Sequence, residues 1–144
     1  MKKKIFDSIY SGKFEEALKA MNVSWLSQNE DEFIEQAFIT QNINLVKFLE
    51  YFSSFQPSEE VPLIIAGKMM QTAFNHIEGG YEKSLSFYRS AISVARDPSR
   101  IQEYLLFFYD LPTPLISQEE AIQIAKDILS RNPESETANR ILRQ

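Results

Sequence analysis

The sequence predicts an all-α protein built from antiparallel helix pairs. Its 144 residues include 4 glycines and 6 prolines, which is sparse for an all-β or loop-rich chain. Apolar residues recur at helical spacing, as in Leu63, Ala66, Met70 and Ile77, and no stretch alternates cleanly with a period of two. Signals for helix starts also return at a regular interval. Together these observations favour one helical domain over residues 1–144.

About nine helices are expected, and eight of them form four pairs. Short breaks at Gly12, Asn42 and Gly79-Gly80 suit the tight turns of antiparallel helix pairs. The last helix has no partner and is expected to cap the C-terminal end of the stack. The expected helices are 2–11 with 14–22, 30–40 with 43–54, 60–77 with 81–95, 98–109 with 118–130, and 134–143 alone.

The expected helix starts share one chemistry. A side-chain oxygen stands three residues before a glutamate, or directly before a proline whose missing N–H costs nothing at the first helical position. Ser58 opens a further helix, with Pro62 in its first turn. The capping residues and their partners are Ser27 with Glu30, Ser117 with Glu120, Asp97 with Pro98, and Asn132 with Pro133.

One short phrase occurs three times in the chain. It consists of an aromatic or polar residue, two charged residues, a small residue and an aliphatic residue. The small residues are Ala17, Ser84 and Ala121, separated by 67 residues (twice about 34) and by 37. A period near 34 is typical of helical-hairpin repeats. We therefore expect these three side chains to be buried where two helices approach closely.

On these positions the sequence resembles the tetratricopeptide-repeat family. The resemblance implies a right-handed αα-solenoid that binds proteins or peptides. The second pair departs from the pattern, since Asn42 replaces the turn glycine and residues 37–49 look more like the helical part of an ankyrin repeat. The Thr-Pro-Leu-His motif of ankyrin repeats is missing, so that family ranks second. The matching positions are Gly79, Tyr81, Ser84, Tyr88 and Ala91 in the third pair, Ala121 and Pro133 in the last, and Gly12, Phe14 and Ala17 in the first.

Charge and composition limit the kinds of partner that the protein is expected to bind and the cellular compartment in which it is expected. The formal net charge is −5 and no basic stripe exists, so nucleic acid is not an expected partner. The longest purely apolar stretches, 104–109 and 63–67, are far shorter than the roughly 18 residues that span a bilayer. A signal peptide would continue with a run of apolar residues after its positive start, but polar residues soon interrupt such a run after Lys2-Lys3-Lys4. With no cysteine for disulfides, the expected location is the cytoplasm.

No catalytic residue, metal site or cofactor is expected. His76 is the only histidine, and it precedes Gly79-Gly80, where it is expected to cap carbonyls at the end of a helix. The acidic doublets 15–16, 59–60 and 119–120 stand at helix starts, where negative charge favours the helix dipole. Neighbouring residues on a helix point about 100° apart, so a doublet does not converge on a substrate. An enzyme therefore ranks last among the functions.

The remaining chemistry is a surface for partners. One stripe lies opposite the core positions of helix 60–77, and another lies beside the core positions of helix 98–109. Aromatic and arginine side chains are typical peptide anchors, although residues 104–109 are apolar on nearly every side and also suit plain packing. We expect both stripes to line one groove. The candidate partner-binding residues are Lys68, Gln71, Asn75, Arg100, Tyr104 and Phe107.

Two functions follow from this surface. The leading hypothesis is a small cytoplasmic module that binds another protein or a peptide, as an adaptor or chaperone does. The alternative is an obligate subunit of a homo-oligomer, whose aromatic-rich helices complete their core across an interface between copies. The aromatic share of 12%, with eleven phenylalanines, makes such an apolar interface plausible.

Overall fold

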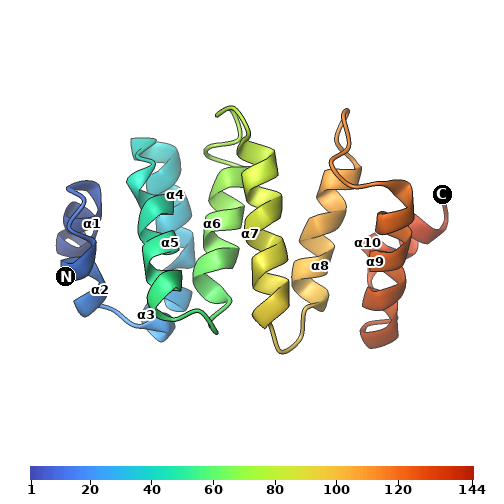
Figure 1. Ribbon diagram of the computed structural model, residues 1–144, viewed down its shortest axis with the longest axis horizontal. Coiled ribbons are helices and arrows are strands. Elements are labelled where there is room, and N and C mark those ends of the chain that lie inside the picture. Colours follow the sequence, from blue (N-terminus) through green and yellow to red (C-terminus); the bar gives the residue numbers. More distant parts are fainter. The chain divides into compact units, whose positions relative to one another are not determined.

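A computed structural model describes all residues 1–144, and helices account for 71% of them, with no strands (Figure 1). The all-α class is therefore confirmed. The chain forms two compact units, residues 1–94 and residues 95–144, which are described separately. None of the helices combines the length and the apolar composition that a bilayer crossing requires. The elements are α1 Lys2–Tyr10, α2 Phe14–Lys19, α3 Val23–Gln28, α4 Glu30–Thr40, α5 Asn44–Phe55, α6 Val61–Gln71, α7 Gly80–Val94, α8 Ser99–Leu106, the 3₁₀ helix η1 Phe107–Tyr109, α9 Gln118–Arg131 and α10 Glu136–Leu142.

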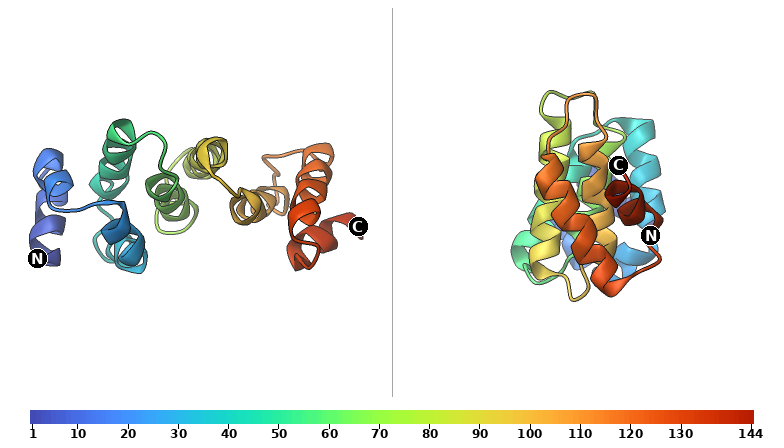
Figure 2. Two further views of the ribbon diagram at one scale, coloured as in Figure 1. Left: turned by 90° about the horizontal axis from the view of Figure 1, so that it is seen from below. Right: turned by 90° about the vertical axis from the view of Figure 1, so that its right-hand side faces the viewer.

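In residues 1–94 the central element is α6. It packs against α3, α4, α5 and α7, while α1 packs against α2 and α5. Along the unit, α5 and α7 lie in one row and α4 lies in the other, with α6 between them (Figure 2, left). Because other helices pack on several sides of α6, its own apolar residues are distributed over much of its circumference. Ile65, Ala66, Met69 and Met70 are all buried.

The core of this unit is rich in aromatic rings. Phe33, Phe48, Phe52, Phe74 and Tyr88 are fully buried. The rings of Phe48 and Phe52 meet edge to face at a centroid distance of 6.3 Å, a favourable aromatic geometry. The phenylalanines that the sequence offered for an interface between copies therefore largely fill the core of the unit itself.

The hairpin of α6 and α7 is the tightest contact in the unit. The Ser84 hydroxyl donates a hydrogen bond to the backbone carbonyl of Gly67 at 2.7 Å, so the two helix backbones lie close together. A Cβ atom on Gly67 would stand 2.7 Å from Cε1 of Tyr88. Gly79 turns the chain between the helices with φ of +73°, a conformation that glycine adopts without strain. As expected, Ser84 is buried, and so are Ala17 and Ala121.

Residues 95–144 form a second helical unit around α9, which packs against α8 and α10. One of the expected caps is present here, since Ser117 Oγ accepts from the Glu120 N–H at 3.0 Å. The expected cap at Asp97 was wrong, because Pro98 is the N-cap residue of α8 and not its first helical residue. Asp97 Oδ1 nevertheless accepts from the Ser99 N–H at 3.1 Å. Polar contacts also tie α10 to the α8 segment, since the Ser135 hydroxyl donates to Glu103 Oε1 at 2.7 Å.

Several expected boundaries were wrong. The short helix α3 was not foreseen, and Ser27 lies inside it, while Asn22 caps it by accepting from the Trp25 N–H at 2.8 Å. Ser58 caps nothing, because α6 begins at Val61 without a side-chain cap. Ser135, rather than Asn132, caps α10, because the chain makes another turn after Pro133 before the helix begins.

Two further corrections concern turns. The left-handed residue between α4 and α5 is Gln41, with φ of +53°, and not Asn42. The Gln41 side chain compensates by donating to the carbonyls of Ala37 and Ala73 at 3.2 and 3.1 Å. Helix α6 ends at Gln71, so His76 lies beyond it, exposed in the following turns, and caps no carbonyl there.

Candidate functional site

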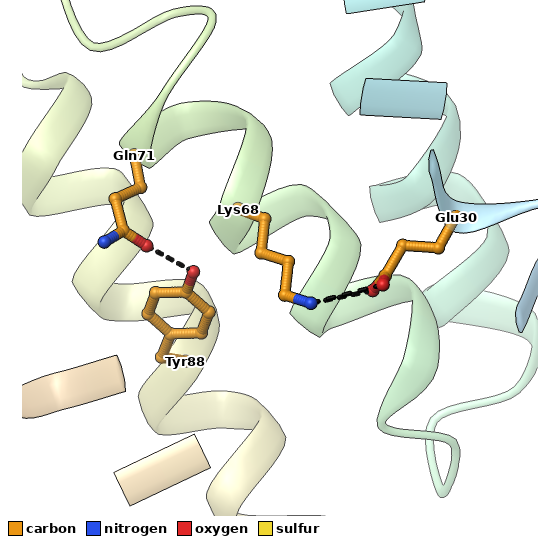
Figure 3. A network of polar contacts seen from close by, with 4 residues as sticks. All are labelled: Glu30, Lys68, Gln71 and Tyr88. Carbon is orange, nitrogen blue, oxygen red and sulfur yellow. Dashed lines mark hydrogen bonds and ion pairs between the residues drawn. The ribbon is translucent and has the colours of Figure 1, made fainter. Parts of the chain in front are cut away.

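Lys68 and Gln71, which were expected to face a partner, hold neighbouring helices together instead. The Lys68 ammonium lies 3.2 Å from both carboxylate oxygens of Glu30 on α4 (Figure 3). About one turn further along α6, Gln71 Oε1 accepts a hydrogen bond from the Tyr88 hydroxyl at 2.6 Å. Both side chains are only partly exposed. The polar side of α6 therefore binds α4 through one residue and α7 through another.

Asn75 stands apart from these two residues. It lies in the turns after α6, where it is exposed, and its side-chain amide donates to the Gln71 carbonyl at 3.2 Å. This bond satisfies one of the carbonyls that the end of a helix leaves open. The three residues expected to form one free polar stripe thus have three different structural roles.

The second expected stripe belongs to residues 95–144. Arg100 is exposed on α8, whereas Tyr104 is half-buried. Phe107 lies in η1 rather than α8, and its ring meets that of the buried Phe108 edge to face at 5.2 Å. The two expected triplets therefore lie in different units, and a groove common to both remains a prediction.

The strongest candidate surface lies on α4, where sequence reasoning had placed no site. Asp31, Glu35, Phe38 and Ile39 are all exposed, and we call these four residues the α4 outer face. At about 100° per residue they fall on one side of the helix, opposite the buried Phe33 and Ala37. Phe38 and Ile39 retain 55% and 66% of their accessible surface, among the largest values for apolar side chains in the chain.

The charges of α4 divide between its sides. Glu30 pairs with Lys68, and Glu32 lines a small cleft of about 230 Å³ together with Lys2 and Lys3. Asp31 and Glu35 have neither an ion pair nor a hydrogen bond from their side chains. The α4 outer face therefore combines two large apolar side chains with two unpaired carboxylates.

A partly buried hydrogen bond and a contact between two aromatic rings hold the side of α4 that faces α1. The Tyr10 hydroxyl donates to Gln36 Oε1 at 2.7 Å, and the ring of Phe6 packs on Phe33 at 4.9 Å. Burial raises the pKa of Tyr10 above its ordinary value, and nearby Asp7 and Glu32 act in the same direction. Tyr10 therefore stays protonated and remains a donor at neutral pH. These contacts hold α4 in place while its opposite side stays open.

A signal for this face was present in the sequence. Apolar residues at positions 33, 34, 37, 38 and 39 cover more than half of the helix circumference, whereas a helix that buries one side needs a narrower stripe. The additional apolar residues predict either a second buried side of the helix or an exposed apolar patch. The structure shows an exposed patch, formed by Phe38 and Ile39.

A larger cleft of about 680 Å³ lies between α1 and α2. Its floor includes the buried Ile5 and Ala17, and Lys4, Glu16 and Lys19 stand around it. Lys19 already pairs with Glu15 at 3.3 Å, and the cleft gathers no convergent set of polar groups. No group of three or more histidine or acidic side chains in the protein is placed to hold a metal ion.

Comparisons with protein-family models, with curated proteins and with solved structures find no match to this chain. The fold defines the class as an all-α protein of short helices. The expected pairing of helix 30–40 with helix 43–54 was wrong, because α4 packs mainly on α6 and α3. Its surface is the basis for a function.

Proposed function

We propose that this protein is a cytoplasmic helical-hairpin-repeat module, similar to tetratricopeptide-repeat proteins, that binds another protein and carries out no catalysis itself. The observation that carries the proposal is the exposure of Phe38 and Ile39 on α4. Exposed apolar side chains that cluster on one side of a helix mark interaction sites more often than scattered ones do.

The packing of residues 1–94 supports the repeat-like part of the proposal. Helices α1 and α2 pack on each other and on α5, and α5 packs on α6, so contacts pass from one helix group to the next along the chain. In repeat proteins, too, each repeat contacts its neighbours. The hairpin of α6 and α7 carries the turn glycine Gly79 and the buried small residue Ser84 at the positions that the resemblance names.

The test is affinity capture with the full chain, followed by reconstitution with the purified partner. Phe38→Ser and Ile39→Ser together are expected to weaken binding at least about tenfold, as the loss of a hot spot does. Phe55→Ser is the matched control, since Phe55 is also exposed, at 60%, but lies at the end of α5. If the α4 double variant binds the partner as tightly as the Phe55→Ser control does, the partner binds elsewhere on the protein.

The sequence-predicted stripe on α8 provides an independent variant. Arg100→Glu changes an exposed residue and is expected to shift the free energy of unfolding by less than about 0.5 kcal/mol. If the partner also contacts α8, Arg100→Glu weakens capture tenfold or more without affecting the thermal midpoint. Equal loss of binding and folding would make Arg100 a structural residue.

The exposed pair on α4 also favours a second candidate, a homo-oligomer in which Phe38 and Ile39 of two copies meet. Light scattering behind size exclusion separates the two candidates. A monomer at micromolar concentration supports the module, whereas a dimer that Phe38→Ser dissociates supports the oligomer.

A further inference from the structure

We propose that the α4 outer face binds a cationic amphipathic segment of another protein. In this arrangement apolar side chains of the segment cover Phe38 and Ile39, and its lysines or arginines pair with Asp31 and Glu35. The proposal rests on the protein-binding function above and specifies the chemistry of the partner.

The order of residues along the helix defines the shape of the complementary segment. The two carboxylates occupy the first half of α4, and the two apolar side chains occupy its last turns. From Asp31 to Ile39 the helix rises about 12 Å, at about 1.5 Å per residue. A helical segment of two to three turns matches this length, with basic residues toward one end and apolar residues toward the other.

The charge of α4 indicates that the partner segment is positively charged. Helix α4 contains four acidic residues and no basic residue, and Lys68 neutralises only Glu30. The carboxylates of Asp31 and Glu35 have no cation of their own in the protein. An acidic segment would meet repulsion here, and a neutral one would leave both carboxylates unpaired at the edge of a dehydrated contact. A cationic segment covers the apolar pair and pairs both charges.

Rigidity of the surface adds to the argument. Phe33 and Ala37 bury the inner side of α4, the Glu30–Lys68 pair fixes its start, and Gln41 bonds its last turn to Ala73. The helix therefore loses little freedom when a partner binds, which lowers the entropic cost of association.

The experiment uses two synthetic peptides of about 14 residues, long enough for more than three helical turns. Both carry leucines at the same helical spacing, and one carries lysines where the other carries glutamates. Each is labelled and titrated with the full-length protein by fluorescence anisotropy at low and high salt. Backbone chemical shifts of the protein map the contact.

The lysine peptide is expected to bind at least about tenfold more tightly than the glutamate peptide at low salt, with shifts concentrated in residues 31–39. Asp31→Asn with Glu35→Gln should weaken its binding about three- to tenfold and reduce the salt dependence. Phe38→Ser should weaken it at every salt concentration. The control, Glu119→Gln with Asp127→Asn, removes two exposed carboxylates from α9 and should leave binding unchanged.

Three results would overturn the proposal. The first is shifts spread over all acidic helices, with equal losses in the α4 and α9 variants, which would indicate unspecific attraction. The second is preferential binding of the glutamate peptide. The third is dimerisation through the same face, which would make a second copy the occupant. If the lysine peptide fails but capture of a natural partner still depends on Phe38, the protein-binding function stands and only the partner chemistry is wrong.

Discussion

Gly67→Ala tests whether α6 and α7 pack as closely as the structure shows. An added Cβ atom would lie 2.7 Å from Cε1 and 2.9 Å from Cδ1 of Tyr88. Carbon atoms in ordinary contact are about 3.5–4.0 Å apart, so the methyl group overlaps two ring atoms at once. The ring has little room to move, because it is fully buried and its hydroxyl is bonded to Gln71 at 2.6 Å.

Two opposing effects set the magnitude. Overpacking in a rigid core costs about 1–3 kcal/mol, and an overlap with two ring carbons belongs in the upper half of that range. Alanine is favoured over glycine inside a helix by about 1 kcal/mol. The net expectation is a loss of about 1–2 kcal/mol in the free energy of unfolding. Without the clash, the same substitution would stabilise the protein.

Urea denaturation followed by tryptophan fluorescence measures this change, because the only tryptophan, Trp25, lies in α3 and α3 packs on α6. The decisive comparison is the same substitution in a Tyr88→Leu background, where the ring is absent and Gly67→Ala should stabilise by up to about 1 kcal/mol. Ser90→Ala on the exposed side of α7 is the control and should change little. Stabilisation by Gly67→Ala in the unaltered protein would refute the close contact.

Three further predictions follow. Ala121→Leu enlarges a fully buried side chain in α9 and should cost about 1–3 kcal/mol in a denaturant melt followed by circular dichroism; a silent result would mean that the site expands freely. Lys68→Met leaves half-buried Glu30 without its partner and should cost about 1 kcal/mol by tryptophan fluorescence, whereas no change would show the pair to be fully screened. The hydrogen bond from the Ser99 N–H lowers the pKa of Asp97, so its stabilisation is present above about pH 4 and lost as the pH falls through the lowered value. Asp97→Asn retains an acceptor and should abolish this acid dependence, and a carboxyl titration by NMR at the ordinary pKa would contradict the hydrogen bond.

Local chemistry made much of the helical fold predictable. The cap at Ser117 joins two residues three positions apart, so the sequence contains all that is needed to find it. Helix α3 was missed because it has only six residues, two of them serines, which is too short for a clear apolar period. Periodicity also misled, because Ala73 and Phe74 continue the apolar spacing of α6 although the helix has ended. They are buried in turns, so the pattern followed burial rather than helical backbone.

The candidate site was harder to predict, because exposure depends on residues far away in the chain. Lys68 looked like a solvent-facing residue of its own helix, but its partner Glu30 lies 38 positions away. Phe38 shows the reverse, since an apolar residue one position after the buried Ala37 suggests packing until the neighbouring helices are known. The apolar period of one helix shows which residues share a side of that helix. It does not show which of these sides a neighbouring helix covers.

The close packing of α6 on α7, which follows it in the chain, has a consequence for how residues 1–94 fold. Contacts between helices close in sequence require only short loops to close, and proteins dominated by such contacts fold in microseconds to milliseconds. The hairpin of α6 and α7 closes over a short turn, is the most extensive contact in the unit and needs no distant segment. We expect the folding nucleus there, with amide protons of α6 exchanging most slowly and those of α1 and α2, at the end of the row, exchanging first. The α4 outer face, the proposed binding surface, would then form after the nucleus, so a partner would meet it only once the centre of the unit is in place.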